Sequence, residues 1–361
     1  MMTFGERFRV TLFGTSHGPE VGVEVEGIPV GTPVEASQIQ EDLDRRRPVG
    51  RRLATRRQEE DRLVVDSGLR EGRSDGSKFR AHVANEDVRR APYDRSRDTP
   101  RPGHADYPAR VRYGAEADLS GGGIFSGRMT VGLVIAGSIA KRLLSARGVE
   151  VVGYTRSVGP VDASVSEEEE LAAVRARSRA NEVGCPDLEA ARRMEEAIAG
   201  ARREGDSLGG VVEVRVEGLP VGVGEPFFDS IESSVAHIAF SVPAVKAIEF
   251  GAGFRSARMK GSDHNDPFVW VDGKVRTVTN HAGGILGGLS TGMPVVFRVA
   301  VKPTSSIARP QRTVNLADGS PATLAVTGRH DPCIVPRAVV VLEAVAAIAL
   351  ADLGIRGGFL Q

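Results

Sequence analysis

The chain contains several short segments in which apolar residues alternate with polar ones or follow one another for a few positions. We interpret these segments as strands and expect them at 8–13, 63–65, 210–216 and 295–301. Elsewhere apolar residues recur every three or four positions, which is typical of helices. Helices are therefore expected over 36–46, 127–144, 228–240 and 336–353, with a charged helical stretch over 167–203.

Glycine and proline mark the expected ends of some helices. The charged stretch should break near Gly184 and Pro186, because proline cannot continue a helix. The helix over 336–353 is expected to end with Gly354 as its C-cap. The helix over 127–144 is apolar on most sides, so we expect it to be buried.

One strand pattern occurs twice. The segment Val23-Glu-Val-Glu-Gly-Ile-Pro-Val-Gly31 returns as Val214-Arg-Val-Glu-Gly-Leu-Pro-Val-Gly222, and an amphipathic helix follows each copy. This pairing favours duplication over chance. Because strands and helices do not alternate regularly, we expect an α+β sandwich rather than a doubly wound sheet. A single domain over 1–361 would then contain two related halves, at about 5–205 and 206–355.

Composition and charge limit the classes of function. The 361 residues include 47 basic and 47 acidic side chains, so no overall basic field suits a nucleic acid or a membrane surface. Residues 1–10 lack the apolar core of a signal peptide. The two cysteines, Cys185 and Cys333, are too few for a disulfide framework, and no metal-ligand spacing occurs. We expect a cytoplasmic protein without metal, nucleic-acid or membrane partners.

Arginine is concentrated at 45–57, where seven of the thirteen residues are Arg. Pro48 and Gly50 break any helix there, so a loop is expected. A solvated coil and an RNA-contacting segment are two interpretations, but the run is internal and three acidic residues follow at 59–61. Guanidinium groups bind carboxylates and phosphates with paired hydrogen bonds, so we favour a lid over a polyanionic small molecule.

Two histidines lie among small residues, where a ligand can approach. His17 is in Gly14-Thr-Ser-His-Gly18, and His104 is in Arg101-Pro-Gly-His-Ala-Asp-Tyr107. Imidazole exchanges protons near neutral pH, and the carboxylate of Asp106 is placed to orient His104. Local hydrogen bonding in a turn explains His17 equally well, and simple exposure on a rigid loop is the alternative for His104.

Three further segments combine glycines, hydroxyls and cations in the way that anion sites do. Residues 120–129 place three glycines before a helix whose N-terminal amides suit an anion, although packing glycines would look the same. Residues 280–288 lead to Lys302-Pro-Thr-Ser-Ser306, which fits a phosphorylated ligand. Residues 328–333 place Arg329 and Asp331 before the last helix, where such a pair also suits a helix cap.

The chain resembles the chorismate synthase family from about Gly5 to about Gly354. Six motifs occur in the family's order: Gly-x-Ser-His-Gly, Asp-Arg-Arg-Arg-Pro, Arg-Pro-Gly-His-Ala-Asp-Tyr, Asn-His-Ala-Gly-Gly-Ile, Lys-Pro-Thr-Ser-Ser and Gly-Arg-His-Asp-Pro-Cys. Each motif alone is weak, whereas six in order are specific. The resemblance implies a β-α-β sandwich with an internal pseudo-two-fold repeat, usually assembled as a homotetramer.

The resemblance also implies a reaction. It is the 1,4-elimination of phosphate from 5-enolpyruvylshikimate 3-phosphate, which gives chorismate in the shikimate pathway to aromatic amino acids. Reduced FMN is required, although there is no net redox change. By position, His17 would protonate the leaving phosphate, His104 would protonate reduced flavin, and Asp331 would assist removal of the C6 proton. The matching substrate-binding positions are Arg46, Arg47, Arg52, Arg101, Arg128 and Arg329.

The cofactor positions follow from the same resemblance. They are Ser126, Gly127, Ala244, Gly287, Lys302, Pro303, Thr304, Ser305, Ser306 and Arg329. Arg46 and Arg52 also match positions that contact NADPH in bifunctional members. A separate flavin reductase is the alternative source of reduced FMN.

Some residues depart from the family pattern. They are Thr15, Ile124, Phe125, Met129 and Pro243, together with Arg56 and Gln58 in the arginine-rich loop. These departures leave two alternatives open. One is a divergent relative that binds flavin or phosphate as a sensor, and the other is a different FMN enzyme acting on a phosphorylated acid.

Overall fold

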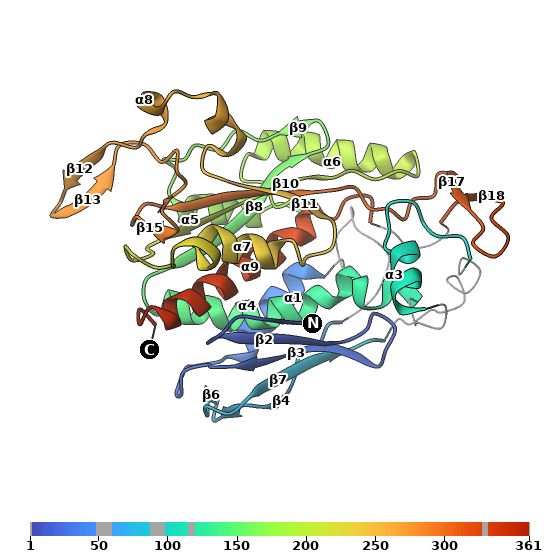
Figure 1. Ribbon diagram of the computed structural model, residues 1–361, viewed down its shortest axis with the longest axis horizontal. Coiled ribbons are helices and arrows are strands. Elements are labelled where there is room, and N and C mark those ends of the chain that lie inside the picture. The colour runs from blue at the N-terminus through green and yellow to red at the C-terminus, as the bar shows by residue number, and fades with distance from the viewer. Residues whose placement is uncertain (1, 48–59, 87–97, 115–119, 327–330, 361) are drawn as a thin grey trace.

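Two antiparallel five-stranded sheets frame the computed structural model, which describes residues 2–47, 60–86, 98–114, 120–326 and 331–360 (Figure 1). The first sheet has the order β1 (Thr3–Phe4), β2 (Arg9–Gly14), β3 (Glu20–Glu26), β7 (Phe79–Ala84) and β4 (Val64–Ser67). The second has the order β11 (Val245–Phe250), β16 (Val295–Val301), β10 (Gly210–Glu217), β8 (Glu150–Val158) and β9 (Val161–Asp162).

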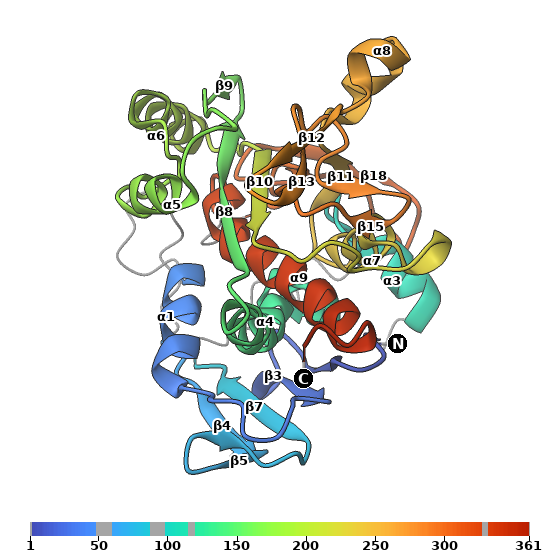
Figure 2. The same ribbon diagram turned by 90° about the vertical axis from the view of Figure 1, so that its left-hand side faces the viewer.

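Helices fill the space between the sheets (Figure 2). The two longest there, α4 (Thr130–Ser145) and α9 (Val335–Arg356), pack against each other, with α1 (Ala36–Arg46) and α7 (Ile231–Ala239) beside them. Two more, α5 (Leu171–Arg179) and α6 (Leu188–Arg203), pack against β8. This layering confirms the expected α+β class and the β-α-β sandwich.

Shorter elements lie at the edges of the sandwich. The helical ones are α3 (Asp106–Tyr113), α8 (Gly261–His264) and the 3₁₀ turns η1 (Ser120–Phe125), η2 (Gly127–Met129), η3 (Phe227–Asp229) and η4 (Gly253–Arg258). The small hairpins are β5 (Leu69–Arg70) with β6 (Arg73–Ser74), β12 (Phe268–Val271) with β13 (Lys274–Thr277), β14 (Ile285–Leu286) with β15 (Leu289–Ser290), and β17 (Gln311–Val314) with β18 (Pro321–Leu324). Figure 1 shows the β12–β13 and β17–β18 hairpins projecting at opposite ends of the molecule.

Alternating valines attach each sheet to the helical layer. Val21, Val23 and Val25 of β3 are fully buried, as are Val212 and Val214 of β10. Successive side chains on a strand point to opposite faces, so each set of valines lies on one face of its sheet. Burying each of these side chains contributes roughly 1.5–3 kcal/mol, which makes the inner faces a main source of stability.

Glycines allow α4 to lie close to its neighbours. A β-carbon on Gly137 would lie 2.2 Å from the β-carbon of Ala344 in α9. A β-carbon on Gly132 would lie 2.7 Å from the carbonyl oxygen of Gly22 in β3. Both distances are well inside van der Waals contact, so α4 can occupy its place only without side chains at these positions.

The repeated sequence pattern adopts the same backbone in both copies. Gly27 and Gly218, which follow β3 and β10, have φ values of 81° and 80°. Gly31 and Gly222, four residues later, have φ values of 81° and 91°. Glycine favours this left-handed region, so the same turn requires the same residue in each copy.

Most of the expected elements are confirmed, with differences at their ends. Helix α1 and strand β16 have the predicted bounds, and the charged stretch divides into α5 and α6. The prediction that Gly354 caps the last helix was wrong, because α9 continues to Arg356. A β-carbon on Gly354 would lie 2.8 Å from Leu360 Cδ1, so this glycine serves packing rather than termination.

A buried cluster of charges joins α1, α4 and α9. Both oxygens of Glu343 accept hydrogen bonds from Arg45, at 2.6 and 2.8 Å, and Lys141 Nζ lies 3.5 Å from Glu343 Oε2. The amide of Gly153 donates to Glu343 Oε1 at 3.0 Å. Burial alone would raise the pKa of Glu343, but Arg45 and Lys141 outweigh it and lower the pKa to about 2.

Helix α9 is long and apolar enough to cross a membrane by length and composition alone. Nearly all of its most apolar window is buried between the two sheets. Its composition is therefore explained by its place in the core.

Replacing Gly137 with alanine should destabilise the protein by about 1–3 kcal/mol, because the added methyl group overpacks the α4–α9 contact. The measurement is the free energy of unfolding in urea. Gly261→Ala is the matched control, since nothing lies within 4 Å of a β-carbon there. Equal stabilities of the two variants would contradict the close packing.

Glu343→Gln should destabilise the protein at pH 7 by about 3 kcal/mol, because it removes the buried carboxylate between Arg45 and Lys141 and leaves these half-buried cations only Asp42 as an acidic partner. The folded pKa of Glu343, about 2, lies below the value of about 4.3 for an unfolded glutamate. This stabilisation is therefore complete above the unfolded pKa and is lost as pH falls toward the folded pKa. The difference between wild type and variant in urea unfolding should shrink from pH 7 to pH 3.

Exposed Glu196 of α6 provides the control. Glu196→Gln should have nearly wild-type stability at both pH values. A Glu343→Gln effect that stayed constant or grew on acidification would contradict the assigned pKa direction.

Candidate active site

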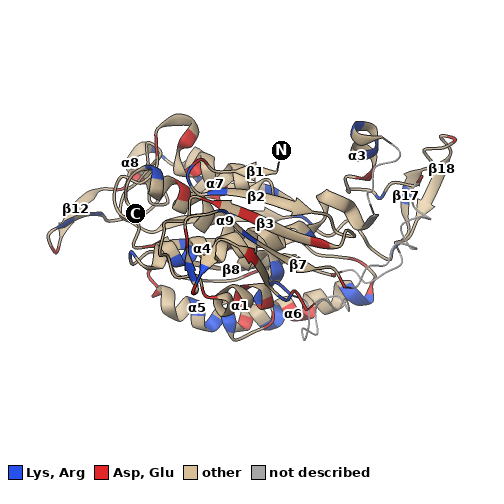
Figure 3. Cartoon of the chain, turned by 90° about the horizontal axis from the view of Figure 1, so that it is seen from below, with Lys and Arg blue, Asp and Glu red and all other residues tan. Residues whose placement is uncertain are grey.

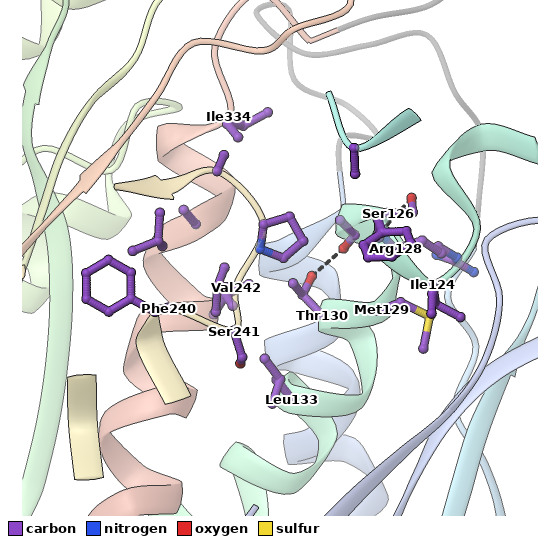
Figure 4. Close-up of a pocket in the computed structure, with 18 of the residues that line it drawn as sticks. Ile124, Ser126, Arg128, Met129, Thr130, Leu133, Phe240, Ser241, Val242 and Ile334 are labelled. Atoms are coloured by element: carbon purple, nitrogen blue, oxygen red, sulfur yellow. Dashed lines mark hydrogen bonds between the residues drawn. The ribbon is translucent and has the colours of Figure 1, made fainter. Parts of the chain in front are cut away.

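A cavity of about 830 Å³ opens where the ends of several elements meet (Figure 4). Its walls include the first turns of α4 and α9, the end of α7 and the loops near 101–105, 240–246 and 302–306. Figure 4 shows Ile124 and Leu133 on one side and Val242 and Ile334 on the other. Small-molecule sites have volumes of roughly 300–1,000 Å³, so the cavity can hold ligands.

Positive charge exceeds negative charge in this cavity. The described part of its lining contains six basic side chains and two carboxylates: Arg46, Arg101, Arg128, Lys246, Lys302 and Arg337 against Asp61 and Asp331. Six minus two leaves an excess of four positive charges, although the whole chain has 47 basic and 47 acidic residues. A cleft with walls of low dielectric constant focuses such a field, so the cavity favours a small polyanion.

Both predicted histidines contact one glycine turn. A β-carbon on Gly121 would lie 1.8 Å from Cε1 of His17, and one on Gly122 would lie 3.4 Å from Cε1 of His104. The two glycines have φ values of 59° and 92°, in the left-handed region that glycine favours. His17 is buried and only 6% exposed, whereas His104 lies in the cavity lining. The bare backbone thus lets both imidazole rings approach one turn beside the cavity.

A carboxylate holds His104 in the way that the motif suggested. Nδ1 of His104 lies 2.6 Å from Oδ1 of Asp106. Arg101 donates to both oxygens of Asp106, from Nε at 2.7 Å and from Nη2 at 2.7 Å. Burial alone would raise the pKa of Asp106, but Arg101 and His104 outweigh it and hold the pKa well below its usual range. An ionised Asp106 favours a hydrogen on Nδ1, which leaves Nε2 for exchange with a ligand.

Two lining arginines share one buried carboxylate. Nη2 of Arg46 donates to Oδ2 of Asp61 at 2.8 Å, and Nη1 of Arg128 donates to Oδ1. Burial alone would raise the pKa of Asp61, but the two guanidinium groups outweigh it and lower the pKa. Burial lowers the pKa of Arg46 to about 10, and repulsion from Arg337 and Arg128 adds to the effect. Arg46 and Asp61 are therefore both charged at neutral pH.

Asp331 also pairs with an arginine. Nη1 of Arg337, in the first turn of α9, donates to Oδ2 of Asp331. Nε of Arg337 donates to the carbonyl of Arg46 at 2.9 Å, and the hydroxyl of Thr304 donates to the carbonyl of Asp331 at 2.7 Å. Asp331 therefore connects the start of α9 to the loop at 302–306.

The loop at 302–306 is bonded to the loop of His104. Nζ of Lys302 donates to the hydroxyl of Ser305 at 2.6 Å, and that hydroxyl donates to the carbonyl of Gly103 at 2.7 Å. Nη1 of Arg101 donates to the hydroxyl of Ser306 at 3.2 Å. Burial and the nearby Lys246 lower the pKa of Lys302. The two loops therefore hold their polar groups in fixed relative positions.

Ala244 adopts an uncommon backbone conformation beside the cavity. Its φ is 75°, in the left-handed region that residues other than glycine rarely occupy. Its carbonyl accepts a hydrogen bond from the amide of Lys302 at 2.9 Å. Such conformations are often found where a ligand is held.

The structure brings most predicted positions together. The described lining includes the catalytic candidates His104 and Asp331, the arginines Arg46, Arg101 and Arg128, and the cofactor positions Ser126, Gly127, Ala244, Lys302, Thr304, Ser305 and Ser306. His17, Arg47, Gly287 and Pro303 are not among the described lining residues. Arg52, Arg329 and most of the predicted lid lie outside the described residues.

Two predicted positions lie away from the cavity for clear reasons. The guanidinium group of Arg47 is held by residues outside the cavity lining. Its Nη1 donates to the carbonyl of Glu60 at 2.7 Å, and its Nη2 pairs with Asp44 at 2.9 Å. Gly287 lies in the turn between β14 and β15, where the neighbouring Gly288 accepts from the amide of Ile231. That contact is at the start of α7, whereas the cavity is at its end.

A family model described as chorismate synthase matches residues 8–355. The chain belongs to the chorismate synthase family. A relative named chorismate synthase from Methanosarcina mazei is 48% identical over 359 residues, which cover 99% of this chain and 97% of the relative. One from Methanocella arvoryzae is 47% identical over 359 residues, covering 99% of this chain and 95% of the relative.

A solved structure supports the same membership. It is described as a crystal structure of chorismate synthase and matches with a TM-score of 0.78 and 27% sequence identity. The match covers 98% of this chain and 93% of the other. The shared fold therefore includes both sheets and the helices between them.

Arg56 and Gln58 lie outside the described residues, and four of the other departures from the chorismate synthase pattern lie at the cavity. Ile124, Phe125, Met129 and Pro243 all line it, so they give part of the wall an apolar surface. Thr15 lies in the loop of His17, where its carbonyl accepts a hydrogen bond from Asn85 at 3.0 Å. These residues change the wall of the cavity and leave His104, Asp331 and the described lining arginines in place.

Sequence reasoning missed several residues of the site, among them Asp61, Asn85 and Arg337. Asp61 and Arg337 line the cavity, and Asn85 bonds to Arg128 at 2.8 Å. Asp61 ends the acidic run after the arginine-rich loop, which was the one signal in the sequence that pointed to a partner for these arginines. Arg337 and Asn85 lie in ordinary helical and strand-end contexts, so no local pattern distinguished them.

Outside the cavity, charges of both signs are mixed. Figure 3 shows basic and acidic residues interspersed along α1, α5 and α6. Nucleic-acid binding proteins usually gather basic residues along one face. The described surface on these helices therefore does not favour the RNA-contacting interpretation.

Proposed function

We propose that this chain catalyses the 1,4-elimination of phosphate from 5-enolpyruvylshikimate 3-phosphate to give chorismate in the shikimate pathway, as a carbon–oxygen lyase. The C6–H bond and the C3–O bond to phosphate break, and the electron pair of the C6–H bond forms part of the new diene. Atoms and electrons balance without net oxidation. Membership of the family over residues 8–355 supports this proposal.

One observation carries the proposal: the described lining residues place an excess of four positive charges around a cavity beside the turn that both histidines contact. The substrate has two carboxylates and a phosphate, and it loses its phosphate as an anion. Preorganised cations stabilise charge that develops on a leaving group. Nε of Arg46 is buried without a hydrogen-bond partner among the described residues, so the site contains a donor that an anion could satisfy.

We propose reduced FMN as the cofactor. The cavity combines an apolar wall, which includes Leu133 and Val242, with the polar loop at 302–306, and this combination fits a flat aromatic ring that carries a phosphate. Lys302, Thr304, Ser305 and Ser306 would hold the cofactor. Reduced FMN, when bound, supplies an electron-rich ring that stabilises the electron-deficient transition state.

The ionisable residues of the site would donate and accept the protons that the reaction moves. His17 would give a proton to the departing phosphate, since its ring packs against Gly121 in the cavity wall. His104 would hold a proton at Nε2, because Asp106 occupies Nδ1. The carboxylate of Asp331 would accept a proton, with Arg337 orienting it. Proton transfers by such positioned groups typically contribute 10²–10⁴-fold to a rate.

We also propose a cytoplasmic homotetramer, in which each chain is one domain with two related halves. Exposed apolar side chains support assembly. Trp270 in the β12–β13 hairpin is 74% exposed, and Phe228 in η3 is 92% exposed. A two-stranded hairpin is only marginally stable by itself in water, so contact with another copy would stabilise it. Sedimentation measures the assembly directly.

Reduced FMN requires a source of electrons, and we propose NADPH. Arg46, one of the two positions implied for NADPH, lies in the cavity lining. Turnover with NADPH and oxidised FMN alone would place the reductase activity on this chain. Turnover only after a flavin reductase is added would place it on a separate protein.

His17→Ala and His104→Ala should each lower turnover by about 10²-fold or more, because each removes a proposed proton donor. The assay is anaerobic, with dithionite-reduced FMN, and follows chorismate absorbance and phosphate release. His264→Ala is the control, because His264 lies in α8 and is not among the described lining residues. Wild-type rates in both variants would overturn the mechanism, and flavin binding without phosphate release by the wild type would overturn the function.

Ser305→Ala should raise the Kd for oxidised FMN by about 5–10-fold, because it removes the hydroxyl that joins Lys302 to Gly103. Quenching of flavin fluorescence measures the Kd. Ser262→Ala, on the exposed surface of α8, should leave the Kd unchanged. An unchanged Kd in Ser305→Ala would exclude this loop as the flavin site.

A further inference from the structure

One carboxylate fixes two guanidinium groups of the cavity. The side chain of Asp61 is fully buried, and those of Arg46 and Arg128 are 4% and 3% exposed. Each oxygen of Asp61 accepts from a different arginine. Because the carboxylate bonds at both ends, it sets the distance and the angle between the two cations.

The bonds continue from Arg128 to the loop of His17. Nε of Arg128 donates to Oδ1 of Asn85 at 2.8 Å. Nδ2 of Asn85 donates to the carbonyl of Thr15 at 3.0 Å and to that of Gly18 at 2.8 Å. These two carbonyls flank His17 in the sequence, so Asn85 bonds to the chain on both sides of the histidine.

The backbone of Asp61 is itself held in an unusual conformation. Its φ is 47°, in the left-handed region, where Asp and Asn are tolerated better than most residues. Nε2 of Gln40 donates to the carbonyl of Asp61 at 3.2 Å, and Oε1 of Gln40 accepts from the amide of Leu63 at 3.0 Å. Helix α1 thus fixes the segment that carries the carboxylate.

We propose that Asp61 and Asn85 are positioning residues for phosphate elimination. Asp61 sets the two guanidinium groups that receive the anionic groups of the substrate, and Asn85 sets the loop of His17 relative to them. The inference rests on the proposed function. It adds to that function a single hydrogen-bonded unit that joins the binding cations to the general acid.

We expect the hydrogen-bonded unit of Asp61 and Asn85 to affect kcat more than the affinity for the substrate. Removing the charge of Asp61 leaves Arg46, Arg128 and Arg337 close together and repelling one another, with their attraction for a polyanion undiminished. Their geometry becomes less fixed, and a misplacement of about 1 Å can cost 10²-fold in rate. Loss of position therefore lowers kcat, whereas the ground-state affinity is kept.

The first test is Asp61→Asn, which removes the charge and keeps both the shape and the tolerance of a left-handed backbone. We expect kcat to fall at least about 10-fold, with KM for 5-enolpyruvylshikimate 3-phosphate unchanged or lower. Asp272→Asn is the matched control, because Asp272 is exposed and has a φ of 49°. Wild-type kcat, or a raised KM with wild-type kcat, would overturn the role of Asp61.

The second test separates the hydrogen bond that Asn85 accepts from the two that it donates. Asn85→Asp keeps an acceptor for Arg128 and loses the donor to Thr15 and Gly18, while Asn85→Ala loses both. We expect kcat to fall about 10-fold or more in each variant. Wild-type kcat in Asn85→Asp would overturn the connection to His17.

Measuring the affinity of each variant for the substrate distinguishes a loss of turnover from a loss of binding or of folding. Calorimetry with oxidised FMN and substrate should give each variant a substrate Kd within about 3-fold of wild type, which also shows that the site is folded. If Asp61→Asn does not fold, Asp61→Glu tests the same point, since it keeps the charge and moves the carboxylate by one methylene. Absent turnover in the wild type would reject the proposed function, whereas wild-type turnover with unaffected variants would reject only this inference.

Discussion

The excess of positive charge around the cavity is the constraint on which the rest of the site depends. Cations close together in a space of low dielectric constant repel one another strongly. Buried carboxylates offset this repulsion and fix the positions of the cations. Asp61, Asp106 and Asp331 provide this, and each is paired with at least one arginine. Among the described lining residues, Asp61 and Asp331 leave an excess of four positive charges, and the pairing of Asp106 with Arg101 reduces it to three. This excess suits a substrate that brings several negative charges of its own.

The fold explains how distant parts of the chain reach this cavity. Helices α4 and α9 begin there, and close packing through Gly137 fixes their relative position. The first sheet supplies the loop of His17, and the second supplies Ala244 and the loop at 302–306. The glycine turn at Gly121 and Gly122 then lets both imidazole rings approach one point.

Periodicity predicted most strands and helices of the sandwich, and α1 and β16 have the expected bounds. Resemblance of motifs predicted site residues most of which lie in the described lining of the cavity. Pairings between individual side chains could not be predicted, because no local pattern shows that Asp61 is opposite Arg128 or that Arg337 is opposite Asp331. Gly354 was misread since packing against Leu360, which has no local signature, decides its role.

The most direct measurement is a crystal structure of the protein with oxidised FMN and 5-enolpyruvylshikimate 3-phosphate. The account predicts that the phosphate lies within hydrogen-bonding distance of His17, that the anionic groups contact Arg46 and Arg128, and that the flavin ring lies between the substrate and His104. Substrate or flavin bound outside this cavity, or a phosphate remote from both His17 and the arginines, would contradict it.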